Sequence, residues 1–506
     1  MATRRSWVTT GITVLTLGVL AGCSAGAGSS SSAGGDGEKD TVTVALNIGA
    51  PANLDFTKTD GAAIPQALLG NVYQGLVALN DDGEIVPALA ESWDLSKDGK
   101  TYTFHLQPDV TFSDGADFTA DDVKFSIERV KSDAWTISLK NKMDVVDKVE
   151  VVSPTEVAVT LANPSNDWLY NMATRVGAMF DSEGVDDLAN SPIGTGPFEM
   201  SDFNRDTSIT LTRRDDYWGD APAVKTVTLK YFDDVNAQIA ALQSGGLDVI
   251  YNIPDYNVID QFKDDDELDI VEGTSTTKWV LSMNNETGLF ADKRVRQAVN
   301  YAVDRDALRT AVANGYGELT GSMVPPTDPW FKDLSGDYPY DPEKAKQLLA
   351  EAGVSNASFD FDVPTLPAAV SAAQVVKSDL ANIGITANIK TMEFPATWLD
   401  EVFTKADYDM SIIGHVESRD LAIYADPDYY FRYDSPEFQQ LMKKGDTGTS
   451  EEQVEDYAAA MQLLSDDAVS DWLYLAANVS IVSSDLEGMP KNAISEGLDV
   501  SKLAWS

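Results

Sequence analysis

The sequence predicts an α/β fold, because strand-like and helix-like patterns alternate along most of its 506 residues. Thr41–Leu46 alternates polar and apolar side chains, which is typical of a half-buried strand. Val123, Ile127 and Val130 instead recur at the helical period and predict an apolar helix face. The chain beyond about residue 40 is long enough for two or three domains, and it contains no repeat of fixed period.

Further elements of the first half follow in chain order. A helical pattern covers Ala67 to Leu79, and a turn at Asn80–Gly83 ends it. Thr101–Leu106 alternates again and predicts a second strand. Thr119 stands at the expected start of the helix that carries Val123, with a capping-box-like sequence behind it.

The second half shows the same two patterns. Apolar residues between Val295 and Val303 recur at the helical period and predict a helix. Asp341 and Pro342 are suited to the N-cap and first position of another helix, which Gly353 is expected to close. A strand is expected from Tyr408 to Ile413, followed by a polar loop.

The beginning of the chain resembles an export signal. A basic start precedes an apolar run from Val8 to Leu20, which is too short for the roughly 20 residues of a membrane helix. Leu20-Ala21-Gly22-Cys23 resembles the bacterial lipobox, in which the cysteine receives a lipid. We therefore expect residues 1–22 to be a signal peptide and Cys23 to anchor the protein outside the cell membrane. Arg4 and Arg5 leave both Sec and twin-arginine export open.

Composition excludes several classes of function. Residues 23–40 hold the lipidated Cys23 and then mainly Ser, Gly and Ala, which predicts a flexible linker. The net charge of −44 excludes a nucleic-acid binder, because phosphates would not be neutralised. Two histidines and one cysteine are too few for a usual zinc or nickel site, so no metal and no cofactor are expected. No nucleophile motif with a histidine partner is present, so no enzyme is expected.

Ten short motifs, in order along the chain, resemble the family of extracellular solute-binding proteins that serves peptide and nickel ABC importers. The motifs are Asn71–Val77, Ile85–Trp93, Gly99–Leu106, Phe112–Gly115, Phe118–Val123, Pro192–Phe198, Asp216–Trp218, Arg294–Ala298, Tyr340–Pro342 and Asp379–Ile385. The resemblance implies a two-lobed periplasmic-binding-protein fold whose lobes close on a ligand. It places lobe I at about 41–275, with an inserted subdomain near 80–190, lobe II at 276–475, and a return to lobe I at 476–506.

The resemblance also implies a function. The protein is expected to be a monomeric binding lipoprotein that delivers short peptides to the permease and ATPase subunits of an ABC importer. Family members hold a peptide as an extended strand and capture its charged ends. Two alternatives stay open: the same transport role for an oligosaccharide, a metal chelate or haem, and a sensor or adhesive lipoprotein on this fold.

The resemblance gives incomplete guidance to the ligand site. Many family members have an amine-binding Asp three residues before an Asp-Pro-Asp sequence, but here Ile423 stands at that position before Asp426. The loop that follows the expected strand carries both acid and base, so we assign Asp420 or Glu417 to the ligand's amine and Arg419 to its carboxylate, beside His415. The alternative is an Arg–Asp pair that only fixes the loop.

Two tryptophans, Trp279 and Trp398, are further candidates for ligand contact. Each could stack on a ligand side chain, although a place in the apolar core is the better-supported interpretation.

Overall fold

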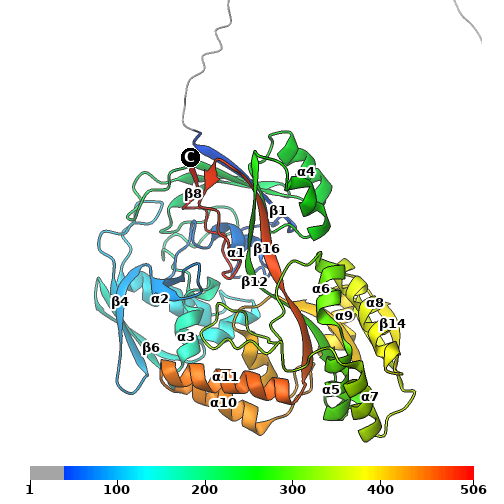
Figure 1. Ribbon diagram of the computed structural model, residues 1–506. Helices are drawn as coiled ribbons and strands as arrows, with labels where there is room; N and C mark the ends of the chain where they lie inside the picture. The colour runs from blue at the N-terminus through cyan, green and yellow to red at the C-terminus, as the bar shows by residue number, and fades with distance from the viewer. Residues whose placement is uncertain (1–38) are drawn as a thin grey trace, which may run out of the picture. The chain divides into compact units, whose positions relative to one another are not determined.

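One ten-stranded sheet runs through residues 39–506, the part of the chain that this computed structural model describes (Figure 1). Its strands are β1 (Thr41–Leu46), β8 (Phe198–Asn204), β9 (Ser208–Arg213), β10 (Thr226–Tyr231), β11 (Val249–Tyr251), β12 (Leu268–Met283), β13 (Ser358–Pro364), β14 (Thr386–Met392), β15 (Met410–His415) and β16 (Ser470–Ser483). They are ordered β14-β13-β15-β12-β16-β11-β1-β10-β9-β8, so the sheet joins strands that lie far apart in the sequence.

Smaller sheets accompany the large one. A four-stranded antiparallel sheet has the order β4-β5-β7-β6, and it lies within the segment predicted as an inserted subdomain. Its strands are β4 (Ala90–Leu95), β5 (Thr101–Leu106), β6 (Val146–Ser153) and β7 (Glu156–Leu161). Two short pairs complete the strands of the described chain: β2 (Val77–Leu79) with β3 (Ile85–Pro87), and β17 (Leu486–Glu487) with β18 (Ala504–Trp505).

Helices alternate with these strands, which makes the fold α/β as predicted. They are α1 (Ala63–Leu68), α2 (Ala120–Lys131), α3 (Asn166–Asn171), α4 (Val235–Gln243), α5 (Lys293–Ala302), α6 (Arg305–Ala313), α7 (Pro342–Glu351), α8 (Pro367–Asn382), α9 (Ala396–Trp398), α10 (Pro436–Thr447) and α11 (Ser450–Asp466). Within residues 39–506, no helix combines the length and apolar character that crossing a bilayer requires. The predicted signal peptide, Cys23 and the linker up to residue 38 lie outside the described residues.

Most of the predicted elements form, and their termini follow the expected capping chemistry. The Asp122 carboxylate accepts a hydrogen bond from the Thr119 backbone N–H at 2.9 Å, which closes the start of α2. The Asp341 carboxylate accepts from the Lys344 N–H at 2.9 Å, and Gly353 follows α7 with a φ of 73°.

Two boundaries predicted from the sequence are wrong. The helix expected from Ala67 to Leu79 ends at Leu68, and the last part of that segment is strand β2. The apolar residues of this segment come from both α1 and β2 and pack in one core, so their spacing resembles that of a single helix face. The strand expected from Tyr408 is shifted by two residues to Met410–His415.

Buried apolar side chains form separate cores toward the two ends of the large sheet. One core contains residues from β1, the four-stranded sheet and the last residues of the chain, and we call the part built around it the first lobe. Two further cores contain only residues between 280 and 476, and we call the part built around them the second lobe. The lobe bounds that the resemblance implied stay a prediction.

The strands β12 and β16 connect the two lobes (Figure 1). They pair from Leu268 with Ser483 to Thr274 with Ala477 in the first lobe, and pairing resumes at Lys278 with Leu475 in the second. Residues 275–277 form an irregularity between these stretches, where the Ser275 hydroxyl accepts from the Thr277 N–H at 3.1 Å and donates to the Ala476 carbonyl at 2.7 Å. Such a break is where two rigid parts can rotate.

Close backbone packing explains one motif of the first lobe. A Cβ on Gly196 would lie 2.2 Å from the Asn71 carbonyl oxygen, and the Gly196 N–H donates to the Val72 carbonyl at 2.9 Å. The loop between Pro192 and Phe198 therefore lies directly against the segment after α1, and only glycine fits there.

We expect Gly196→Ala to lower the free energy of unfolding by about 1–3 kcal/mol, because the added methyl group must push two backbone segments apart. Gly336→Ala is the matched control, since a Cβ at Gly336 meets no atom within 4 Å. Urea unfolding of both variants measures the difference, and equal stabilities would contradict this close-packing explanation.

Candidate functional site

The loop at residues 416–420 lies beside the irregularity that joins the lobes. It follows β15, whose last residue His415 pairs with Lys278 at the start of β12's second-lobe stretch. The Thr276 hydroxyl donates to the Val416 carbonyl at 2.6 Å, which ties the loop to the connecting segment. On its other side, the Ser418 hydroxyl donates to the Ile494 carbonyl of the first lobe at 3.3 Å.

A buried ammonium group holds this loop in place. The Lys278 side chain is only 1 % exposed, and its Nζ donates to the Glu417 carbonyl at 2.6 Å and to both Asp420 carboxylate oxygens at 3.0 Å. These contacts use the three donors of the ammonium group. Burial raises the pKa of Asp420 to about 6, although Lys278 acts in the opposite direction.

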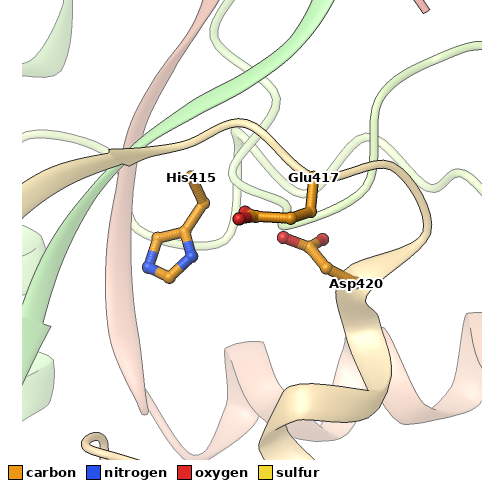
Figure 2. A group of neighbouring side chains, drawn as sticks. All are labelled: His415, Glu417 and Asp420. Carbon is orange, nitrogen blue, oxygen red and sulfur yellow. The ribbon is translucent and has the colours of Figure 1, made fainter. Parts of the chain in front are cut away.

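Glu417 contrasts with Asp420, because its side chain is exposed and no ion pair within the described residues involves it. Figure 2 shows its carboxylate facing that of Asp420, next to the His415 ring. One potential ligand atom from each of these three residues lies within 4.8 Å of the others, which is close enough for the three to bind one cation. Lys278 already supplies a positive charge to Asp420 at this place.

His415 is buried between the strand and an aromatic cluster. Its Nε2 lies 2.8 Å from the Tyr430 hydroxyl, and the two rings are parallel to within 5°. Burial lowers the pKa of His415 to about 3, with Lys278 acting in the same direction. The imidazole is therefore neutral at ordinary pH, and it can offer a hydrogen bond but no charge.

Arg419 lies between aromatic rings of both lobes. Its guanidinium carbon is 3.9 Å from the centre of the Tyr170 ring, which belongs to α3 of the first lobe, and 4.8 Å from that of Trp330 in the second. The side chain is 9 % exposed, and its Nε lies 3.6 Å from an Asp328 carboxylate oxygen. Arg419 Nε and the other Asp328 oxygen are both buried without a hydrogen-bond partner within residues 39–506.

The two tryptophans do not join this cluster. Trp279 packs on the core of the opposite sheet face and stacks on Tyr474, with ring centres 6.3 Å apart. Trp398 is 2 % exposed, and its indole N–H donates to the Ser411 hydroxyl at 2.9 Å. The structure therefore brings Asp420, Glu417, Arg419 and His415 together, buries Trp398 in an apolar core and leaves Trp279 half-buried against another. Ligand contact by any of them stays a prediction.

Sequence reasoning did not identify several charged or aromatic residues of this cluster, among them Lys278, Asp328 and Tyr170. Lys278 stands in a strand of mixed polar and apolar residues, and nothing in that pattern indicates a buried ammonium group. Asp328 follows two prolines in a loop, and Tyr170 comes from a six-residue helix more than 200 positions away from Arg419 in the sequence. Only the tertiary fold brings these residues together.

Two lobes that share hinge-like strands and meet over a charged loop define a ligand-binding protein of the two-lobed class. Residues 84–440 match the family model described as "Bacterial extracellular solute-binding proteins, family 5 Middle", and the chain belongs to this family. The resemblance stated from the sequence motifs is therefore confirmed.

Similar proteins agree with this assignment. The dipeptide-binding protein of Escherichia coli K12 is 32% identical over 372 residues, which cover 67% of this chain and 68% of that protein. Heme-binding protein A of Haemophilus influenzae is 32% identical over 356 residues, covering 64% of this chain and 65% of its own. The alignments thus span about two thirds of each relative.

A solved structure supports the fold over a longer range. The DppA periplasmic binding protein of Helicobacter pylori, in complex with the peptide STSA, superposes with a TM-score of 0.76 at 24% identity. The match covers 92% of this chain and 98% of that one, which confirms the two-lobed α/β fold.

We expect Lys278→Met to lower the free energy of unfolding by about 3–5 kcal/mol near pH 8, because it leaves the buried Asp420 carboxylate unpaired. Without Lys278 the folded-state pKa of Asp420 rises above its present value of about 6. The carboxyl group is then neutral in the folded variant at pH 5, so the loss of stability is smaller there.

Urea unfolding at pH 8 and pH 5 measures this difference. Lys225→Met is the control, because Lys225 pairs with Asp40 on the exposed surface and its loss should change stability little. A Lys278→Met deficit of the same size at both pH values would contradict the role assigned to the ammonium group.

Proposed function

We propose that this protein is the substrate-binding lipoprotein of an ABC importer and that its cargo is a short peptide. The observation that carries the proposal is the 416–420 loop, which presents an unpaired acid and a guanidinium where the lobes meet. A peptide has a charge of each sign at its two ends, so this loop suits both. A relative named as a dipeptide-binding protein and a similar structure with a bound peptide support the same cargo.

Of the two acids, we assign the ligand's amino group to Glu417 rather than Asp420. Lys278 neutralises Asp420 and engages both of its oxygens, whereas the Glu417 carboxylate is exposed and faces the same space. Asp420 then positions the loop. Arg419 is assigned to the ligand's carboxylate, because it is the one cationic side chain of this loop, and its ion pair with Asp328 is long, at 3.6 Å.

Delivery and location belong to the same proposal. The protein acts as a monomer outside the cytoplasm, held at the cell membrane by a lipid on Cys23, and passes its ligand to a permease driven by ATPase subunits. Rotation about residues 275–277 of β12 supplies the lobe movement that traps and releases the ligand. No bond of the ligand is made or broken, so the protein is a binding component and not an enzyme.

A thermal-shift experiment tests the cargo. Ligand at 100 times its dissociation constant adds about 2.7 kcal/mol to stability, so binding is visible as a rise in the melting temperature. We expect a mixed library of di- to pentapeptides to raise it, and oligosaccharides and haem to leave it unchanged. Haem is included because one relative is named a heme-binding protein. Stabilisation by sugars or haem alone would replace the peptide as cargo.

We expect Glu417→Gln to weaken binding of peptides with a free amino end about tenfold, because a charge-assisted hydrogen bond becomes a neutral one. Peptides with an acetylated end should bind the variant and the wild type alike. Calorimetry with both kinds of peptide measures the effect, and Glu455→Gln on the exposed face of α11 is the control. Equal weakening of both kinds of peptide would remove Glu417 from this role.

A further inference from the structure

Helix α3 of the first lobe is bound to the second lobe by a compact set of polar contacts. The Ser165 hydroxyl donates to an Asp446 carboxylate oxygen at 2.8 Å, and the Asp167 N–H donates to the same oxygen at 3.1 Å. The Asn166 amide group donates to the carbonyls of Gly445 and Gly448 at 2.9 and 3.0 Å. These contacts join the start of α3 to the last turn of α10 and to Gly448, the residue that follows α10. Helices α10 and α11 lie next to α3 in Figure 1.

The side chain of Asp167 continues the contact into α11. One carboxylate oxygen accepts from the Gln453 amide at 2.9 Å, and the other accepts from the Tyr457 hydroxyl at 2.9 Å. Tyr457 can reach this place because a Cβ on Gly445 would lie 2.5 Å from its ring. The glycine in α10 therefore leaves room for the tyrosine, and six hydrogen bonds cross from α3 to the second lobe.

Ser165, Gln453 and Tyr457 are buried in this contact, and Asn166, Asp167 and Asp446 are half-buried. Burial raises the pKa of Asp167 to about 6, and the nearby Asp446 adds to the effect. The Tyr457 hydroxyl acts in the opposite direction, as do the charges of Arg419 and of Lys142 in the first lobe. Buried polar groups are costly unless they are paired, so each bond across this contact matters to its stability.

The same helix also touches the 416–420 loop. Tyr170 lies three residues after Asp167, on the same side of α3, and its ring covers the Arg419 guanidinium at 3.9 Å. Arg419 faces Trp330, and Trp330 meets the Tyr457 ring edge-on at 4.9 Å. A closed circuit of contacts thus runs from Asp167 to Tyr457, Trp330 and Arg419, and back to α3 through Tyr170.

We propose that α3 is a latch that holds the two lobes closed and connects closure to the 416–420 loop. The hinge-like segment of β12 and β16 permits rotation, and α3 provides the first-lobe surface that engages the second lobe when the rotation is complete. Because the Tyr170 ring packs on Arg419, the latch closes fully only when Lys278 holds the 416–420 loop in the position described above. The latch goes beyond the proposed peptide cargo and forms whatever the ligand is.

The Asp167 backbone N–H offers a specific probe of the latch. It lies in the first turn of α3, where an N–H group has no partner within the helix. Its protection from hydrogen exchange therefore depends on the Asp446 carboxylate of the second lobe. In the full chain without added ligand, we expect this amide to be protected in the wild type and to lose protection in Asp446→Ala.

Two milder variants distinguish an effect on the latch from an effect on the stability of the whole protein. Tyr457→Phe removes one hydrogen bond of the latch and should reduce protection of the Asp167 amide roughly fivefold, as expected for a typical hydrogen bond. Tyr338→Phe removes the 2.8 Å bond from its hydroxyl to the Ser465 carbonyl and a 3.4 Å bond from the Gln297 amide, both inside the second lobe. It should leave the Asp167 amide unchanged. Both variants keep the tyrosine ring and its packing.

Small-angle scattering of Asn166→Ala combined with Asp446→Ala gives an independent measurement. The double variant lacks four of the six bonds, so we expect its radius of gyration to exceed that of the wild type. An Asp167 amide that exchanges in the wild type as fast as an unstructured peptide would overturn the proposal. Equal loss of protection in Tyr457→Phe and Tyr338→Phe, or unchanged scattering of the double variant, would also overturn it.

Discussion

The buried contact between Lys278 and the 416–420 loop determines the rest of the site. Its ammonium group holds the Glu417 carbonyl and the Asp420 carboxylate, so the loop follows the hinge strand β12 rather than moving on its own. The same contact neutralises one acid and leaves the other exposed. Breaking a buried ion pair leaves an uncompensated charge, so losing this contact would lower stability strongly. Arg419 stands between Glu417 and Asp420, so the same contact also fixes its position.

Arg419 contacts aromatic rings of both lobes, so the proposed ligand contact and the proposed lobe movement meet at this residue. A guanidinium between two aromatic rings keeps its N–H groups in the ring-free directions, where an acidic group can meet them. One ring belongs to each lobe, so the electrostatic surroundings of Arg419 depend on whether α3 is engaged. A ligand that binds between the lobes stabilises the closed arrangement by the difference between its binding free energies in the closed and open arrangements.

The α/β class could be predicted from local patterns, the two-lobed architecture from the family resemblance, and the site only in part. Alternating strands such as Thr101–Leu106 and capped helices such as α7 depend on neighbours within a few residues, which the sequence displays directly. The grouping of His415, Glu417 and Asp420 was predictable because they follow one strand closely. Lys278 and Tyr170 could not be predicted, because their roles arise from pairing and packing between distant segments, and Ala67–Leu79 misled because two elements share one core.

The central place of β16 has a consequence for folding. In the sheet order, β16 stands between β12 and β11, so the four strands from β14 to β12 are joined to the five from β11 to β8 only through β16. Without Ser470–Ser483 in place, β12 and β11 would each be an open sheet edge. Non-local pairing of this kind is slow and leaves unpaired strand edges exposed, so the two halves of the sheet join only when β16 is available to both.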